Sequence, residues 1–205
     1  MSATPVTANS GITVGHYGKL PGRGDFIRHG WDDATIEALD HWLADGLAAW
    51  RPDDDAEFAR LFAAAPLYEF YLPAGQIGAE AMLGVLSPSV DRAGRFFFLV
   101  AGVTGAAAAL WHLAVNRADF VYAAADAVYA ALGPASDPDA LAAAIAAVVP
   151  DDHDDVPWRA RLSTPADAVF WAEGDGEPLV IRSPLLDAPL LAALLNTTPI
   201  TGGVA

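Results

Sequence analysis

Cysteine is absent from the 205-residue chain, and Lys19 is its only lysine. The lack of cysteine excludes disulfides, thiol catalysis and Cys-ligated zinc. A phosphate-binding loop of the form GxxxxGK[ST] is also excluded, because Lys19 precedes the neighbouring glycines and no Ser or Thr follows it. The chain has neither an HExxH zinc motif nor a GxSxG nucleophile elbow, since Ser89 stands in SPSVDR. We therefore expect no metal ion, no cofactor and no enzymatic activity.

Basic residues as a group are scarce. The chain has 11 Lys and Arg residues against 26 Asp and Glu residues, a net charge of -15. Nucleic acid is excluded as a partner, because a duplex-binding protein needs a basic stripe that displaces counterions. Within residues 17–28 and 84–99, however, basic residues are concentrated. If these two stretches meet in space, they form a local positive site on an acidic body. Their basic residues are Lys19, Arg23, Arg28, Arg92 and Arg95.

Long apolar runs and a leader peptide are also missing. The Ala-rich region 120–149 is interrupted by three aspartates, so it does not read as a membrane span. The first residues carry neither a basic nor an apolar signal-peptide region. These absences predict a cytoplasmic protein without direct membrane insertion. With 54% apolar residues, disorder is excluded, and we expect a flexible tail over residues 1–12 followed by one α/β domain over residues 13–205.

Two uninterrupted apolar runs, residues 82–86 and 96–103, dominate the middle of the chain. Neither run alternates between apolar and polar residues, and this pattern is typical of strands covered on both faces. The connection between them, residues 87–95, is then expected to emerge at one edge of the sheet. It carries the polar residues Ser87, Ser89, Asp91, Arg92 and Arg95.

The remaining patterns predict a mixed sheet covered by helices on both faces, a three-layer α/β/α sandwich. Strands are expected at residues 14–20 and 67–72, with a late hairpin formed by residues 168–173 and 179–182. Helices are expected after Asp32 and Asp33, from Asp55, over residues 110–132 with a break at 116–119, from Asp137 and from Asp187. Residues 150–157 read as a solvated acidic loop.

The charged residues of the two basic stretches are the candidate binding residues. The turn PGRGD presents Arg23 and Asp25, and we expect one of them to lie near Asp91, Arg92 or Arg95. Two interpretations stay open: the charges pair with each other and fix the loops, or the Arg forks receive a carboxylate or phosphate from a partner. The candidate set is Lys19, Arg23, Asp25, Arg28, Ser89, Asp91, Arg92 and Arg95.

Three segments together resemble a known family. HYGKLPGRGDFIRHG, APLYEFYLPAGQIG and GVLSPSVDRAGRFFFL resemble, in this order and spacing, the signature of the TagF family of type VI secretion-associated proteins. The resemblance spans about residues 14–196. It implies a cytoplasmic α/β/α sandwich that regulates, usually represses, type VI secretion assembly after translation by binding the system's forkhead-associated scaffold protein. One departure is Phe98, where the family tends to have proline, a change that a strand interior tolerates.

Two other functions remain as alternatives at this stage. A small hydrolase or phosphate-handling enzyme would use Ser89, Asp91 and the neighbouring arginines. A structural accessory subunit of the secretion apparatus would instead co-purify stably with other components. The first alternative predicts turnover that is lost when either named residue is replaced by alanine.

Overall fold

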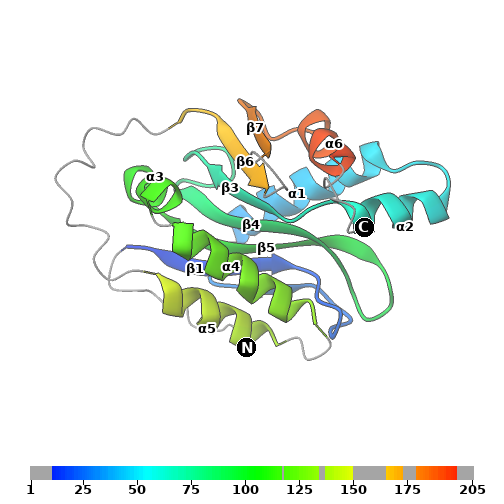
Figure 1. Ribbon diagram of the computed structural model, residues 1–205, viewed down its shortest axis with the longest axis horizontal. Helices are drawn as coiled ribbons and strands as arrows, with labels where there is room; N and C mark the ends of the chain where they lie inside the picture. Colours follow the sequence, from blue (N-terminus) through cyan, green and yellow to red (C-terminus); the bar gives the residue numbers. More distant parts are fainter. Residues whose placement is uncertain (1–10, 117, 134–136, 150–164, 173–178, 198–205) are drawn as a thin grey trace, which may run out of the picture.

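The computed structural model describes residues 11–116, 118–133, 137–149, 165–172 and 179–197. Its centre is a seven-stranded sheet with the strand order β2-β1-β5-β4-β3-β6-β7 (Figure 1). The acidic loop expected at residues 150–157 lies outside the described residues. The strands are β1 Thr13–Gly18, β2 Ile27–His29, β3 Tyr68–Leu72, β4 Ala81–Val90, β5 Phe96–Gly105, β6 Ala168–Ala172 and β7 Leu179–Ser183.

All six pairs of neighbouring strands are antiparallel, so the expected mixture of parallel and antiparallel strands is wrong. The apolar runs of β4 and β5 could not reveal this. Continuous apolar runs are typical of parallel strands because helices cover both of their faces. Here β4 and β5 have the same two-sided cover although they form an antiparallel hairpin.

Helices cover the sheet on both faces, which confirms the three-layer α/β fold (Figure 1). Helices α1 and α6 pack against each other and, with α2, on one face. Helices α3, α4 and α5 pack on the other face, where they contact β1, β3, β4 and β5. The helices are α1 Asp33–Trp50, α2 Asp55–Ala64, α3 Ala107–Asn116, α4 Ala118–Ala131, α5 Pro138–Val148 and α6 Ala188–Asn196.

Aspartate side chains cap the starts of four helices. The Asp32 carboxylate accepts a hydrogen bond from the backbone N–H of Thr35 at 2.7 Å and so begins α1. The cap of α2 is Asp54, one residue before the expected Asp55. Asp137 and Asp187 cap α5 and α6, each with a proline in the first turn. The four predicted helix starts are therefore correct to within one residue.

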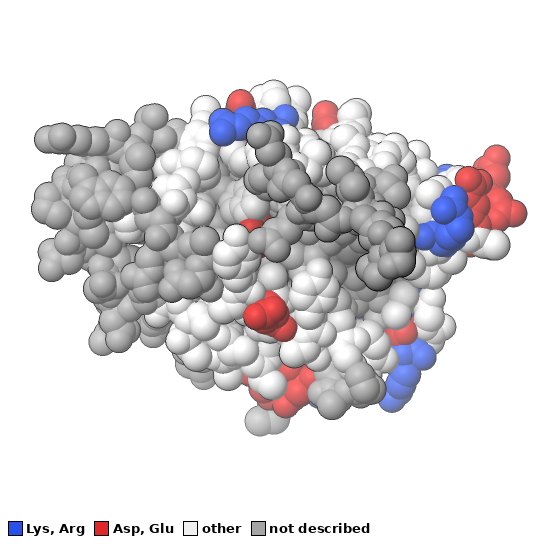
Figure 2. Space-filling model, viewed as in Figure 1, with Lys and Arg blue, Asp and Glu red and all other residues white. Residues whose placement is uncertain are grey.

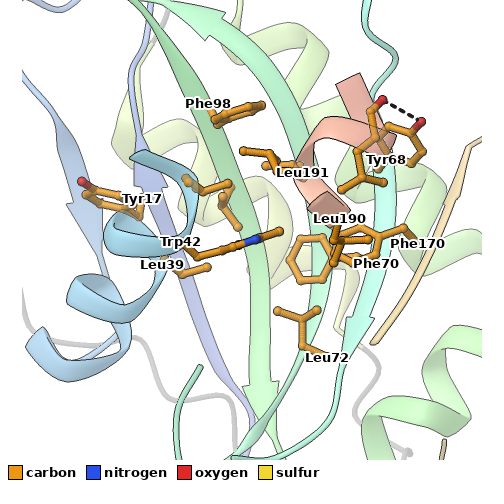
Figure 3. Close-up of a cluster of buried hydrophobic side chains, with 14 of the residues drawn as sticks. Tyr17, Leu39, Trp42, Tyr68, Phe70, Leu72, Phe98, Phe170, Leu190 and Leu191 are labelled. Atoms are coloured by element: carbon orange, nitrogen blue, oxygen red, sulfur yellow. Dashed lines mark hydrogen bonds between the residues drawn. The ribbon is translucent and has the colours of Figure 1, made fainter. Parts of the chain in front are cut away.

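Two hydrophobic cores lie on the two faces of the sheet. The core under α1 and α6 is rich in aromatic rings from the sheet and the helices (Figure 3). In it, the Tyr68 hydroxyl donates to the carbonyl oxygen of Leu194 at 3.0 Å, and the Trp42 indole N–H donates to that of Asp187 at 3.2 Å. The second core, under α3, α4 and α5, is mostly aliphatic. It includes Ile12, which the sequence predicts to lie in the flexible tail and which is buried in the structure.

The β4–β5 hairpin positions the candidate site. Strand β4 continues to Val90, so residues 87–90 belong to the strand and the connecting loop is reduced to residues 91–95. Both strands are largely buried along their length.

No helix within the described ranges is long and apolar enough to cross a membrane.

Candidate functional site

The two basic stretches meet at one end of the sheet, as the sequence predicted. The first loop, residues 19–26, follows β1, and the second loop, residues 91–95, joins β4 to β5. The backbone N–H of Arg92 donates to the carbonyl oxygen of Arg23 at 2.8 Å. The Arg95 guanidinium donates from Nη2 to the carbonyl oxygen of Gly24 at 2.6 Å. Because β1 pairs with β5, the loops at these strand ends are brought side by side.

Asp91 lies at the centre of a set of buried contacts that we call the buried clamp, consisting of Lys19, Ser89, Asp91 and Arg95. Its side chain is fully buried. One carboxylate oxygen lies 3.2 Å from Lys19 Nζ and 2.6 Å from Arg95 Nε. The other accepts hydrogen bonds from the backbone N–H groups of Ala93 and Arg95, each at 2.9 Å. Asp91 thus receives four donors from within the chain.

The four donors determine the charge state of Asp91. Burial by itself raises the pKa of this carboxyl group, but the hydrogen bonds from Arg95, Lys19 and Ala93 outweigh burial and hold the pKa well below its usual range. The group is therefore ionised at neutral pH and neutralised by its own neighbours. It has neither the raised pKa of a general acid nor a free face toward a ligand.

The other members of the clamp are held in the same way. The Ser89 hydroxyl donates to the carbonyl oxygen of Lys19 at 2.7 Å and is buried. The Lys19 ammonium is also buried and lies 5.1 Å from the centre of the Phe26 ring. Lys19 and Ser89 thus fasten the first loop to the end of β4. Only Arg95 reaches the surface, where its side chain is 63% exposed.

A second group of residues on the same loops faces outward. We call it the loop surface, and it consists of Arg23, Asp25, Phe26 and Arg92. Phe26 is 46% exposed although its ring stacks on Tyr17 and meets the edge of Phe97, with ring centres 5.5 Å and 4.9 Å away. Both arginines are exposed, and neither makes an ion pair with any residue that the structure describes.

The loop surface borders an open groove of about 540 Å³. The opposite wall is the start of α5, at Pro138 and Asp139. The Arg92 guanidinium lies against Gly24, where an added Cβ would stand 3.4 Å from Nη2. The Arg92 side chain therefore lies close to the first loop, and a Cβ at position 24 would make only an ordinary van der Waals contact with it.

Arg28, the remaining candidate, is separate from both groups. It lies on the edge strand β2 and forms an exposed ion pair with Asp33, with Nη1 and Oδ1 2.9 Å apart. An exposed pair of this kind contributes little to stability. The eight candidates therefore divide into the four residues of the buried clamp, three residues of the loop surface and the outlying Arg28.

Phe26 is not among the binding residues that the sequence predicts. The residue directly follows the PGRGD turn, and an aromatic side chain next to turn residues could have indicated an exposed ring. The alternation of β1, in which Tyr17 faces the aromatic core, places the Tyr17 ring beneath Phe26.

No group of three or more His, Asp or Glu side chains that could hold a metal ion is present in the described part of the chain.

Fold and site together define a class: a three-layer domain with an antiparallel sheet, whose two adjacent loops combine a buried ion-pair cluster with an exposed cationic and aromatic surface. Residues 15–148 match the family described as the TagF N-terminal domain, type VI secretion system-associated, and the chain belongs to this family. This match contains every residue of the clamp and the loop surface.

A solved structure extends the similarity beyond the matched region. The crystal structure of PA0076 from Pseudomonas aeruginosa PAO1 is 26% identical in sequence, with a TM-score of 0.72. The alignment covers 94% of this chain and 100% of PA0076. No curated protein matches the chain.

Proposed function

We propose that this protein is a non-enzymatic, cytoplasmic regulator that represses type VI secretion assembly after translation by binding the forkhead-associated scaffold protein of the system. The observation that carries the proposal is the loop surface. Arg23 and Arg92 extend from loops that the buried clamp fixes, and no carboxylate of the described residues pairs with them. A charged surface without internal partners is suited to a partner outside the chain.

The residue types of the loop surface support protein binding. Arginine and aromatic side chains are enriched among residues that contribute most to interface affinity. A guanidinium can accept a carboxylate in a bidentate pair, and Phe26 adds an apolar anchor beside it. Because the clamp fixes the loops before binding, less conformational entropy is lost on association.

The arrangement of Ser89 and Asp91 argues against the hydrolase alternative. The Ser89 hydroxyl donates its hydrogen bond to a backbone carbonyl, which cannot act as a general base. Asp91 is occupied by four donors and stays ionised. Both groups support the loops, and neither has the geometry of a nucleophile or proton carrier.

The test is a calorimetric titration of the purified chain with the purified scaffold protein. We expect Arg23→Glu combined with Arg92→Glu to weaken binding at least tenfold while the melting temperature stays unchanged, because both side chains are exposed. The control is Arg60→Glu, which makes the same Arg-to-Glu replacement at one exposed position of α2 and is compared with Arg23→Glu and Arg92→Glu as single variants. Wild-type binding by the double variant would reject the loop surface, and no binding by the wild-type chain would reject the scaffold as partner.

Secretion in cells separates regulation from a structural role. Overexpression of the wild-type chain is expected to reduce effector secretion, and the double variant is expected to lose this effect. A structural accessory subunit would instead co-purify in fixed stoichiometry with sheath or membrane components. Unchanged secretion after both deletion and overexpression would contradict the proposal.

A further inference from the structure

A second hollowed surface lies on the α4 side of the molecule. It shares no lining residue with the groove of the loop surface, although Pro21 of the first loop and Ser89 of the buried clamp lie in its wall. It consists of two adjoining hollows of about 750 Å³ and 320 Å³ that share Pro66, Leu67 and Tyr129. The larger hollow lies between the end of α2, the end of β4 and α4, and the smaller one continues toward Ala172 at the end of β6. We call the two together the α4 trench.

The α4 trench is lined mainly by apolar and aromatic groups. The larger hollow has walls from Phe62, Pro88 and Phe96. Tyr122 and Tyr129 border the trench on α4 and are 48% and 60% exposed. Their spacing of seven residues places both rings on one face of the helix. Large exposed rings along an apolar hollow are typical of surfaces that bind another chain.

The charge of the trench is negative. Its charged lining residues are Glu69, which is buried, and Asp126, which is exposed between the two tyrosines. Neither hollow has a lysine or arginine among its described lining residues, and Asp126 forms no ion pair within the described chain. In Figure 2, which has the α4 helix on the near side, the visible Lys and Arg side chains lie at the rim of the view and an acidic side chain stands near its middle.

We propose that the α4 trench binds an extended segment of a partner protein that carries apolar side chains and one lysine or arginine. The basic side chain pairs with Asp126, and the apolar side chains lie on Leu67 and against the tyrosine rings. The trench crosses the ends of β4, β3 and β6, so it accommodates about four residues of extended chain, given strand spacings of about 4.8 Å and a rise of about 3.4 Å per residue. Its negative charge separates it from the loop surface, whose exposed arginines suit an acidic partner.

The probe that tests this proposal is a random 12-residue peptide library displayed on phage and selected against the full chain. We expect enriched peptides to combine apolar residues with at least one Lys or Arg. Synthetic copies of these peptides are expected to bind at least tenfold more weakly to Asp126→Lys and to Tyr129→Asp. A peptide whose basic residue is replaced by Glu should bind Asp126→Lys again, because the two charges are then opposite. The same peptide should bind the wild-type chain more weakly than the original peptide does.

The control is Asp53→Lys, which makes the same charge change at an exposed position before α2 and should leave peptide binding unchanged. Peptide binding should also persist in the Arg23→Glu, Arg92→Glu variant, so that the result is independent of the scaffold experiment. Circular dichroism checks that each variant is folded. No enrichment, enriched peptides without a basic residue, or equal binding to wild type and both trench variants would overturn the proposal. Self-association that sedimentation detects and Tyr129→Asp abolishes would overturn it as well, because a second copy would then be the occupant.

Discussion

The buried clamp and the loop surface are formed by neighbouring residues of the same two loops and the end of β4, yet the charges of the clamp pair inside the chain and those of the loop surface do not. In the clamp, Asp91 satisfies Lys19 and Arg95 inside the chain. On the loop surface, Arg23 and Arg92 point outward without a described ion-pair partner. The difference follows from local backbone geometry, because the N–H groups of the tight 91–95 turn already bind the Asp91 carboxylate. The two signature segments that contain these loops therefore provide both the buried clamp and the loop surface that the clamp holds in place.

The strongest test of this division is Asp91→Ala. The substitution leaves the Lys19 ammonium buried without its counter-charge and removes the acceptor of two backbone N–H groups. Breaking a buried ion pair from one side is strongly destabilising, so we expect the melting temperature to fall by roughly 12 °C. Differential scanning calorimetry measures the change. Asp25→Ala, an exposed aspartate of the neighbouring loop, should change the melting temperature by less than about 2 °C. Equal shifts for the two variants would remove the distinction.

Two glycines of the first signature segment provide a second comparison. Gly18 has a φ of +138°, and an added Cβ would collide with the carbonyl oxygen of Phe98. We expect Gly18→Ala to cost about 3 kcal/mol in the free energy of unfolding. Gly24→Ala should change it by less than about 1 kcal/mol, because its Cβ would meet only the mobile end of Arg92. Urea denaturation measures both changes, and a similar cost at the two positions would contradict the difference in crowding between Gly18 and Gly24.

Most elements of the fold could be predicted from local patterns. The apolar runs of β4 and β5 predict two buried strands, and the capping aspartates predict the starts of α1, α5 and α6; the structure confirms both. The extension of β4 through Ser87 and Ser89 was missed, since polar residues are typical of loops. Strand direction and order could not be predicted either, because the connection from β2 through two helices to β3 leaves three other strands, β1, β5 and β4, between them in the sheet. That path depends on packing between distant helices.

The candidate site was predictable in position but not in its division of roles. The charged residues of the two segments indicated that the loops meet, and the structure brings Arg23 and Arg92 together through their backbones. Whether an arginine pairs inward depends on distances of a few ångströms between loops. Arg95 reaches Asp91 and Gly24, whereas Arg92, three residues earlier, turns along the first loop. Sequence spacing alone does not distinguish these two orientations.

The buried side chain of His16 makes the stability of the fold depend on pH. Burial, together with the neighbouring His29, lowers the pKa of His16 to about 4. Because this folded-state pKa is depressed from about 6.5, the neutral ring stabilises the fold above pH 6.5, and this contribution is lost as the pH falls toward 4. We expect a loss of about 3 kcal/mol at pH 4 that is absent in His16→Phe. The exposed His41→Phe is the control.

The contributions of His16 and Asp91 to stability are lost in different pH ranges. The pKa of Asp91 is also depressed, but from a carboxyl value, so its contribution is present above about pH 4 and is lost only below it. In urea titrations at several pH values, His16→Phe should remove the loss between pH 6.5 and 4 and keep the loss below pH 4. A His16→Phe profile identical to wild type between pH 6.5 and 4 would contradict this assignment.

Phe26→Ser is expected to have the smallest effect on stability. It distinguishes most clearly between the buried clamp, which stabilises the loops, and the loop surface, which is proposed to bind a partner. The ring is half-exposed, so Phe26→Ser should cost only about 1 kcal/mol in the free energy of unfolding. If the loop surface binds the scaffold, the same substitution should weaken that binding at least tenfold, because an apolar anchor next to two arginines is lost. Phe97→Ser, at the buried ring below it, reverses the order: a large loss of stability at a position that no partner can touch. A binding loss for Phe26→Ser that tracks its stability loss would make Phe26 part of the support.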